Sequence, residues 1–308
     1  MLPTRDGIGP SVVGLPVGPW ARVIDFLSER FPGVPVPEWV QRMQRGEVVD
    51  SRGLSVWPDQ LYEPQAMGQR LYYYRSLPSE APNAAAERVL FEDETIVVAD
   101  KPHFLPVTPG GKHLQETLLV RLRRRLGCDT LTPLHRLDRE TAGLVLLARH
   151  PESRAAYEAL FAQRQVTKTY QAIARWDPQL QFPLRRVSTL VDADHFMQMR
   201  EAGADDTPQL PNAHTTIELL EIQGSWARYA LQPQTGKRHQ LRVHMAALGI
   251  PILGDRIYPQ LLPEGTDDPA NPLRLLAERL QFTDPITGQA RDFVSQFALD
   301  FPDPLSFS

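Results

Sequence analysis

The stretch PLHRLDRETAGLVLLAR, residues 133–149, places one acidic side chain among basic ones, directly before an apolar run. Asp138 has Arg136 and Arg139 within two residues of it. A carboxylate beside guanidinium groups stays ionised, because an opposite charge favours its charged form. An ionised carboxylate in a turn next to a buried strand can act as a nucleophile. It can also simply stabilise the turn or pair with an arginine, so the spacing alone leaves both interpretations open.

Other groups near this stretch offer weaker alternatives. His135 has no serine or cysteine nucleophile close to it in the sequence. A glycoside-type hydrolase usually needs two carboxylates that flank the bond, and the nearest second acid to Asp138 is Glu140. His239 and His244 are five residues apart, which is not the i, i+4 spacing of a helical zinc pair. We therefore predict no metal site.

The elements that must position Asp138 can be read from hydrophobic periodicity. Residues 143–148 form an unbroken apolar strand, and residues 167–175 alternate so that Lys168, Tyr170 and Ala172 share one face. Strands interrupted by a few helices indicate an α+β domain with a mixed, largely antiparallel sheet and flanking helices. The other predicted strands lie within residues 88–102, 214–222, 225–233 and 280–295, and the predicted helices are 116–127, 151–164 and 237–249.

The N-terminal part has a different composition. We predict an irregular arm over residues 1–19, a small αβ domain over 20–76, a linker over 77–86 and the main domain over 87–308. In the small domain, two short amphipathic helices precede the short strands GEVVD, LSVW and LYYYR.

Composition limits the classes of protein. The net charge is −4, but residues 101–175 hold 13 basic and 6 acidic residues (+7), and residues 226–258 hold 5 and 1 (+4). These basic blocks fit an anionic polymer as partner, or equally two solvated faces. The lone Cys128 excludes a disulfide framework and favours a cytoplasmic protein. We expect no secretory signal, no membrane span and no membrane partner.

Four stretches carry a resemblance to a known family. HRLDRETAGL, EDETIVVADKP, KTYQAIA and TGKRHQLRVHMAALGIPILGDRIY resemble motifs of the RluA-type pseudouridine synthases and cover about residues 87–300 in the family's order. Residues 20–76 resemble, less closely, the S-four-like RNA-binding domain of many members. The resemblance implies a cofactor-free isomerase that detaches uracil from ribose in RNA, turns it and reattaches it through C5. The base must be flipped out of the RNA and held by stacking.

The resemblance also implies roles for single residues. Asp138 is the expected catalytic aspartate, as nucleophile or as proton acceptor; Tyr170 is expected to stack on the base, and Arg242 to pair with the aspartate. Without the resemblance, Tyr170 would be read as core packing and Arg242 as a surface arginine of a helix, where it shares a face with Arg238. The predicted RNA-binding residues are Arg136, Arg139, Lys168, Lys237, Arg238, His239, Arg121, Arg124 and Arg125.

Two positions depart from the family. Ala142 stands where serine is common, and Leu276 stands where many members carry a histidine. We predict an RNA pseudouridine synthase that acts as a monomer, on ribosomal RNA ahead of transfer RNA because of the N-terminal domain. A catalytically silent RNA-binding protein and a glycoside-type hydrolase are the alternatives.

Overall fold

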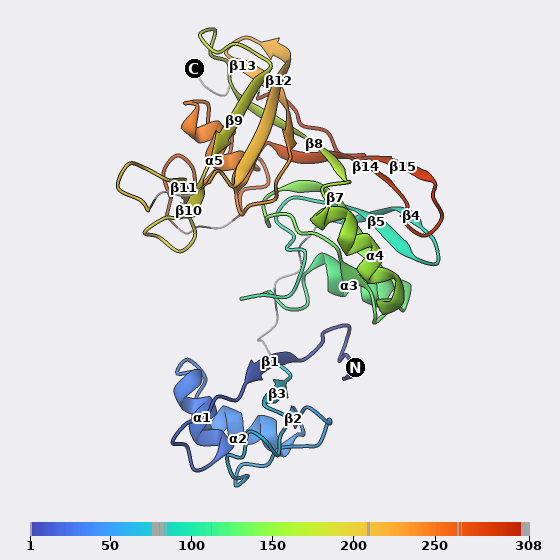
Figure 1. Ribbon diagram of the computed structural model, residues 1–308, viewed down its shortest axis with the longest axis vertical. Helices are drawn as coiled ribbons and strands as arrows, with labels where there is room; N and C mark the ends of the chain where they lie inside the picture. Colours follow the sequence, from blue (N-terminus) through green and yellow to red (C-terminus); the bar gives the residue numbers. More distant parts are fainter. Residues whose placement is uncertain are drawn as a thin grey trace. The chain divides into compact units, whose positions relative to one another are not determined.

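The computed structural model describes residues 2–75, 80, 83, 85–111, 113–207, 210–263, 265 and 267–302. The chain divides into two compact units (Figure 1). The smaller unit comprises Met1–Ala81 with Gly110–Gln115, and the larger comprises Pro82–Pro109 with Glu116–Ser308. Most of the linker predicted over residues 77–86 lies outside the described residues.

The smaller unit packs two helices, α1 (Val23–Arg30) and α2 (Val36–Gln44), with a sheet of order β1-β3-β2. Its core contains the apolar faces predicted for both helices, including Phe26, Leu27, Trp39 and Met43. Two predictions were wrong. Residues 11–14 of the supposedly irregular arm form a strand paired with β3, and LSVW contributes only an isolated bridge at Ser55. The strands are β1 (Ser11–Gly14), β2 (Val48–Asp50) and β3 (Arg70–Tyr73).

The larger unit is built on a sheet that has ten strands in the described part of the chain. Its order is β4-β5-β7-β14-β8-β13-β12-β9, with β15 beside β14 and β6 beside β7. Every pairing is antiparallel except that of β14 with β7, so the predicted fold class is confirmed. The strands are β4 (Arg88–Glu92), β5 (Ile96–Lys101), β6 (Thr132–Pro133), β7 (Ala142–Ala148), β8 (Thr167–Arg175), β9 (Leu184–Ser188), β12 (Ala213–Gln223), β13 (Trp226–Pro233), β14 (Leu275–Thr283) and β15 (Ala290–Val294).

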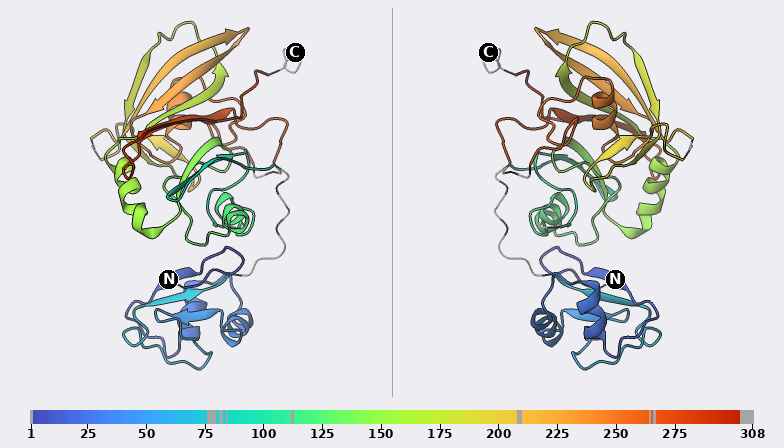
Figure 2. Two further views of the ribbon diagram at one scale, coloured as in Figure 1. Left: turned by 90° about the vertical axis from the view of Figure 1, so that its right-hand side faces the viewer. Right: turned by 90° about the vertical axis from the view of Figure 1, so that its left-hand side faces the viewer.

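Helices cover both faces of the β5–β7 end of this sheet. Alternate strand residues point to opposite faces, and the two sets pack in different clusters: Val97 and Val145 with α3 (Leu118–Leu126), Val98 and Leu146 with α4 (Pro151–Ala162). This explains why β5 and β7 read as unbroken apolar runs. Figure 2 shows α3 and α4 near this end of the sheet.

The third helix of the larger unit, α5 (Gln240–Ala247), packs on the other end of the sheet. Leu241 and Met245 pack in one apolar cluster with residues of β8, β12 and β13. The helix begins later than predicted, because His239 before it adopts a left-handed conformation with φ 55°. A separate pair of strands, β10 (Leu190–Asp192) and β11 (Met199–Glu201), was not predicted. None of the described helices has the length and apolar character needed to cross a membrane.

Candidate active site

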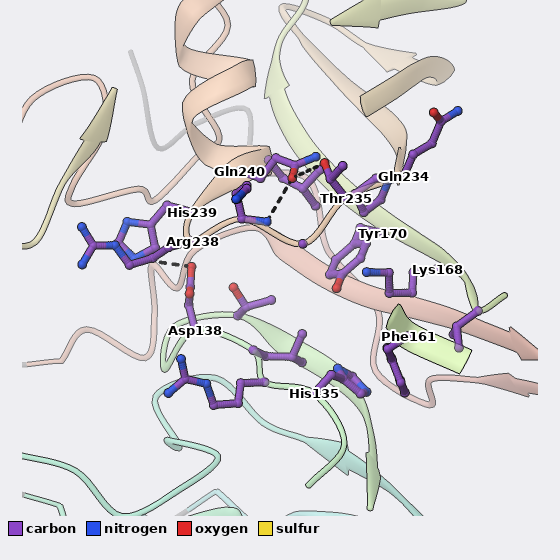
Figure 3. A pocket seen from close by; sticks show the side chains of 18 of the residues that line it. His135, Asp138, Phe161, Lys168, Tyr170, Gln234, Thr235, Arg238, His239 and Gln240 are labelled. Atoms are coloured by element: carbon purple, nitrogen blue, oxygen red, sulfur yellow. Dashed lines mark hydrogen bonds and ion pairs between the residues drawn. The ribbon is translucent and has the colours of Figure 1, made fainter. Parts of the chain in front are cut away.

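The larger unit contains a pocket of about 1390 Å³. Its walls come from the loop before β7, the start of β8, the segment between β13 and α5, and the first turn of α5. Figure 3 shows Asp138 on one side of this pocket, with Tyr170 and Lys168 on the other. The volume exceeds the upper range of roughly 1,000 Å³ for small-ligand sites, as a nucleotide with its flanking chain would require.

Asp138 lies in the loop between β6 and β7, with 27% of its side chain exposed. Its carbonyl accepts the Thr141 N–H at 3.2 Å, which closes a turn. The buried Lys101 amino group donates to the next carbonyl, that of Arg139, at 3.1 Å, and burial lowers the pKa of Lys101 to about 7. Gly143 follows with φ 113°, where a Cβ would come within 2.3 Å of the Ala277 carbonyl oxygen. These contacts hold the loop directly after the aspartate.

Arg242, in the first turn of α5, joins two carboxylates. Its Nη1 donates to Asp138 Oδ2 at 3.1 Å, and its Nε and Nη2 donate to the two oxygens of Asp255 at 2.8 Å each. Both side chains of the Arg242–Asp255 pair are 1% exposed. Burial lowers the pKa of Arg242, but the hydrogen bonds and charge of Asp255 outweigh it, so the pKa lies above its ordinary value. The reading of Arg242 as a surface arginine is wrong.

Asp255 itself was missed by sequence reasoning. Its Oδ1 also accepts the backbone N–H groups of Ile257 and Tyr258 at 2.8 and 3.0 Å. It thereby fixes both the guanidinium and the turn that follows. The only signal for it in the sequence is the aspartate in GDRIY, thirteen residues after Arg242.

His239 stands beside the aspartate rather than at the outer surface. Its Nε2 is 3.8 Å from Asp138 Oδ2, and its Nδ1 is 3.0 Å from the Tyr258 hydroxyl, which accepts the Met199 N–H at 2.7 Å. Burial lowers the pKa of His239, although the Asp138 charge opposes this. A neutral imidazole therefore borders Asp138 at neutral pH.

Tyr170 faces Asp138 from strand β8 (Figure 3). Its backbone pairs with Ala277 on one side and Leu231 on the other, in the middle of the sheet. Burial, together with the Asp138 charge, raises the pKa of the Tyr170 hydroxyl well above its ordinary value. The phenol therefore stays protonated and presents an apolar ring with a hydroxyl donor to the pocket.

Comparison with known proteins identifies the family. The family model for RNA pseudouridylate synthase matches residues 95–247. An uncharacterised RNA pseudouridine synthase of Synechocystis is 31% identical over 238 residues, which cover 77% of this chain and 79% of that protein. The chain belongs to the RNA pseudouridine synthase family. It is therefore an isomerase that acts on RNA.

Two further comparisons agree. The dual-specificity RNA pseudouridine synthase RluA of Salmonella typhimurium is 32% identical over 207 residues, 67% of this chain and 90% of that protein. The solved structure of human RNA pseudouridylate synthase domain containing 1 shares the fold, with a TM-score of 0.55 at 24% identity over 73% of this chain and 87% of that one.

The pseudouridine synthase pocket gathers six of the nine predicted RNA-binding residues. Arg136 and Lys237 are exposed at it, while Lys168 and His239 are partly buried. The prediction that Arg238 shares a helix face with Arg242 was wrong. Because α5 starts at Gln240, Arg238 lies in the preceding turn. There it donates to Asp192 and to the Gln198 carbonyl at 3.0 Å. The sixth, Arg139, lines the pocket and pairs with Glu140 and Asp267.

The three arginines of α3 that were predicted to bind RNA do not line this pocket. Arg121 pairs with Glu87 and Glu116, and Arg125 pairs with Glu87. The third, Arg124, lies on the same helix, and the RNA-binding role of all three stays a prediction.

The described residues contain no group of three or more ligands that could hold a metal ion. His244, which the sequence paired with His239, is fully buried. Its ring lies 3.0 Å from the Ser188 hydroxyl and 2.9 Å from that of Thr215, so it belongs to an internal network.

The two departures from the family fall at one place. Ala142 of β7 pairs with Leu276 of β14, and both are buried in one apolar cluster with Ile173 and Leu299. Both positions carry an apolar residue where the family commonly has a polar one. The two apolar side chains are therefore compatible with each other in this cluster.

Proposed function

We propose that this enzyme isomerises a uridine of a structured RNA with Asp138 as its essential carboxylate and without a cofactor. The observation that carries the proposal is the placement of Asp138. It borders a pocket opposite Tyr170, and a buried guanidinium binds one of its oxygens at 3.1 Å. The second oxygen, Oδ1, has no hydrogen bond to a described residue. That oxygen is available to the ribose.

Breaking the N1–C1′ bond leaves ribose short of electrons. A carboxylate can respond by bonding to C1′ or by taking the C2′ proton, and both require the ionised form. Arg242 favours that form because its charge is opposite. Tyr170 supplies the ring against which a flipped base stacks.

The glycoside-type hydrolase is disfavoured by the second acid. Glu140 does not line the pocket, and it pairs with Arg139 at 3.3 Å. The silent binding protein is disfavoured because binding alone does not require a buried Arg242–Asp255 pair aimed at one exposed carboxylate.

The next question is which class of RNA is the substrate. We propose ribosomal RNA with transfer RNA as the second candidate, and the dual-specificity relative of Salmonella supports testing both. We also propose that the smaller unit binds RNA weakly. Several of its arginines are already neutralised: Arg22 by Asp25, Arg42 by Glu38 and Arg52 by Asp50.

The test is tritium release from RNA labelled at uridine C5, with ribosomal and transfer RNA supplied separately from cells that lack the protein. Asp138→Asn should lower release at least about 100-fold, as removal of a group that transfers protons or attacks carbon does. Asp129→Asn, at an exposed position of the same unit, is the matched control. Turnover by Asp138→Asn at the wild-type rate would contradict the assignment, and free uracil as product would favour hydrolysis.

A further inference from the structure

Lys168 lies two residues before Tyr170 on strand β8, so the two side chains share one face. Its backbone pairs with Leu280 of β14 in the ordered sheet. In Figure 3 the Lys168 side chain is directed into the pocket beside the Tyr170 ring. Its amino group also lies close to Gly236, at 3.9 Å from the place where a Cβ would stand. The ammonium therefore lies near the segment that leads to α5.

The charges around Lys168 differ from those around three arginines of the pocket. Arg139, Arg238 and Arg242 each pair with a carboxylate. Among the described residues no carboxylate pairs with Lys168, although its side chain is partly buried. Burial lowers the pKa of Lys168. A cation removed from water without a partner is unfavourable, so its position indicates that an anion arrives with the substrate.

The neighbouring His135 does not supply that anion. The His135 ring lies close enough to Lys168 for the two charges to interact. His135 Nε2 accepts the Leu146 N–H at 3.0 Å, and its ring stacks on Phe161 at 5.1 Å. Burial lowers the pKa of His135 to about 3. It therefore stays neutral, and its Nδ1 carries the proton.

The isomerisation generates an anion at one moment. When the N1–C1′ bond breaks heterolytically, its electron pair remains on uracil, and the negative charge spreads over N1, O2 and O4. The electron deficit on ribose is met by Asp138, through a bond to C1′ or removal of the C2′ proton. After the base turns, C5 bonds to C1′ as the Asp138–C1′ bond breaks or, in the other route, as Asp138 returns the proton to C2′. The C5 proton then leaves, and N1 gains a proton. No atoms are added or lost overall.

We propose that Lys168 is a catalytic residue that stabilises the negative charge on uracil as the N1–C1′ bond breaks. This rests on the proposed function of Asp138. A base stacked on Tyr170 presents one edge to the residue two positions earlier on the same strand face, which is Lys168. A charged donor aimed at developing charge in a partly dry site stabilises the transition state more than the ground state.

An RNA phosphate is the other anion that could meet this ammonium. A phosphate carries its charge in the free, bound and transition states alike, so such a contact contributes to binding and not to rate. Exposed cations at the same pocket, Arg136, Arg164 and Lys237, suit that role. The two possibilities therefore predict different kinetics.

The test compares Lys168→Met, Lys168→Arg and Lys237→Met in the full chain. Single-turnover rates at saturating enzyme report the chemical step, and filter binding over a range of salt reports phosphate contacts. Lys168→Met should lower the rate about 10²–10³-fold, the range for loss of one charge-stabilising donor, with Kd within about threefold and an unchanged salt slope. Lys168→Arg should recover part of the rate. Lys237→Met should weaken binding and reduce the salt slope by about 0.7–0.9.

A leaving-group series gives an independent readout. Fluorine at C5 withdraws electrons and stabilises the uracil anion. The defect of Lys168→Met in consuming 5-fluorouridine should then be smaller than its defect with uridine. A misfolded variant would lose both reactions equally, and circular dichroism checks the fold directly.

Three results with Lys168→Met would overturn the inference. The first is a wild-type rate with weaker RNA binding and a lower salt slope, and the second is a wild-type rate with unchanged binding. The third is an equal loss of rate with uridine and with 5-fluorouridine. Each assumes that the wild type releases tritium. If the wild type does not, the proposed function itself fails, and the two failures are thereby distinguished.

Discussion

Asp255→Asn tests whether Arg242 is held in place by a second carboxylate. The substitution keeps the shape of the side chain, removes its charge, and turns an NH₂ group toward the guanidinium. Both side chains are 1% exposed, and the pair is joined by two hydrogen bonds of 2.8 Å. The guanidinium would keep its hydrogen bond to Asp138 and a longer ion pair with Glu140 at 3.9 Å.

The expected loss of stability follows from this geometry. Breaking a buried ion pair by removing one partner costs roughly 3–5 kcal/mol. The lower end applies here, about 3 kcal/mol, because Arg242 keeps Asp138 at 3.1 Å and an amide oxygen can still accept the backbone N–H groups of Ile257 and Tyr258. Urea denaturation measures this as a lower midpoint at an unchanged slope.

Activity should fall as well, about tenfold or more in kcat with little change in KM, because a loosely held Arg242 no longer orients Asp138. Asp292→Asn is the matched control: it removes the carboxylate of an exposed pair with Arg279, whose partners are 46% and 43% exposed. Such a pair contributes at most about 1 kcal/mol. Equal losses in the two variants, or a fall in stability without any fall in kcat, would refute the positioning role of Asp255.

Two further predictions concern Tyr170 and His244. Tyr170→Phe keeps the stacking ring and removes a hydroxyl that stays protonated, so the single-turnover rate should fall about tenfold while RNA binding in a filter assay changes little; an unchanged rate would reduce Tyr170 to a stacking surface. Burial lowers the pKa of the fully buried His244 to about 4, below its usual value of about 6.5 when unfolded. The unfolded state therefore binds more protons than the folded state between these values. The stability that the neutral His244 contributes to the folded state is fully present above about pH 6.5 and is lost as pH falls toward 4. By pH 4.5 the wild type should lose about 2–3 kcal/mol more than His244→Gln in urea unfolding, and parallel losses would contradict this.

The elements that were predictable from sequence are those with long, regular patterns. Strand β8 was predicted with the bounds that the structure has, and α3 ends at Gly127 with φ 59°, where a left-handed residue closes a helix. The short strands β1, β10 and β11 were missed, because three or four residues carry little periodicity, and the partner of β1, strand β3, lies far along the chain. The start of α5 was misplaced because a left-handed His239 is set by tertiary contacts.

The residues of the site also divide into those that the sequence predicts and those that it does not. Asp138, Tyr170 and Arg242 stand in recognisable motifs, and the fold brings them to one pocket. Asp255 could not be inferred, since its partnership with Arg242 spans thirteen residues and depends on a turn. Clustering of charge in sequence was a poorer guide. Arg121 belongs to the most basic stretch, yet it pairs with two acids and does not line the pocket.

The polarity of the pocket connects these residues to the reaction. Asp138 and Lys168 occupy opposite sides of it in Figure 3, and the Tyr170 ring lies on the Lys168 side. A nucleoside whose base stacks on Tyr170 has its ribose toward the carboxylate and a base edge toward the ammonium. Heterolysis of the bond between them makes ribose positive and uracil negative, which is the direction that these two charges favour. Because Asp255 already balances Arg242, the guanidinium orients Asp138 without fully neutralising it, and the carboxylate retains charge for the ribose.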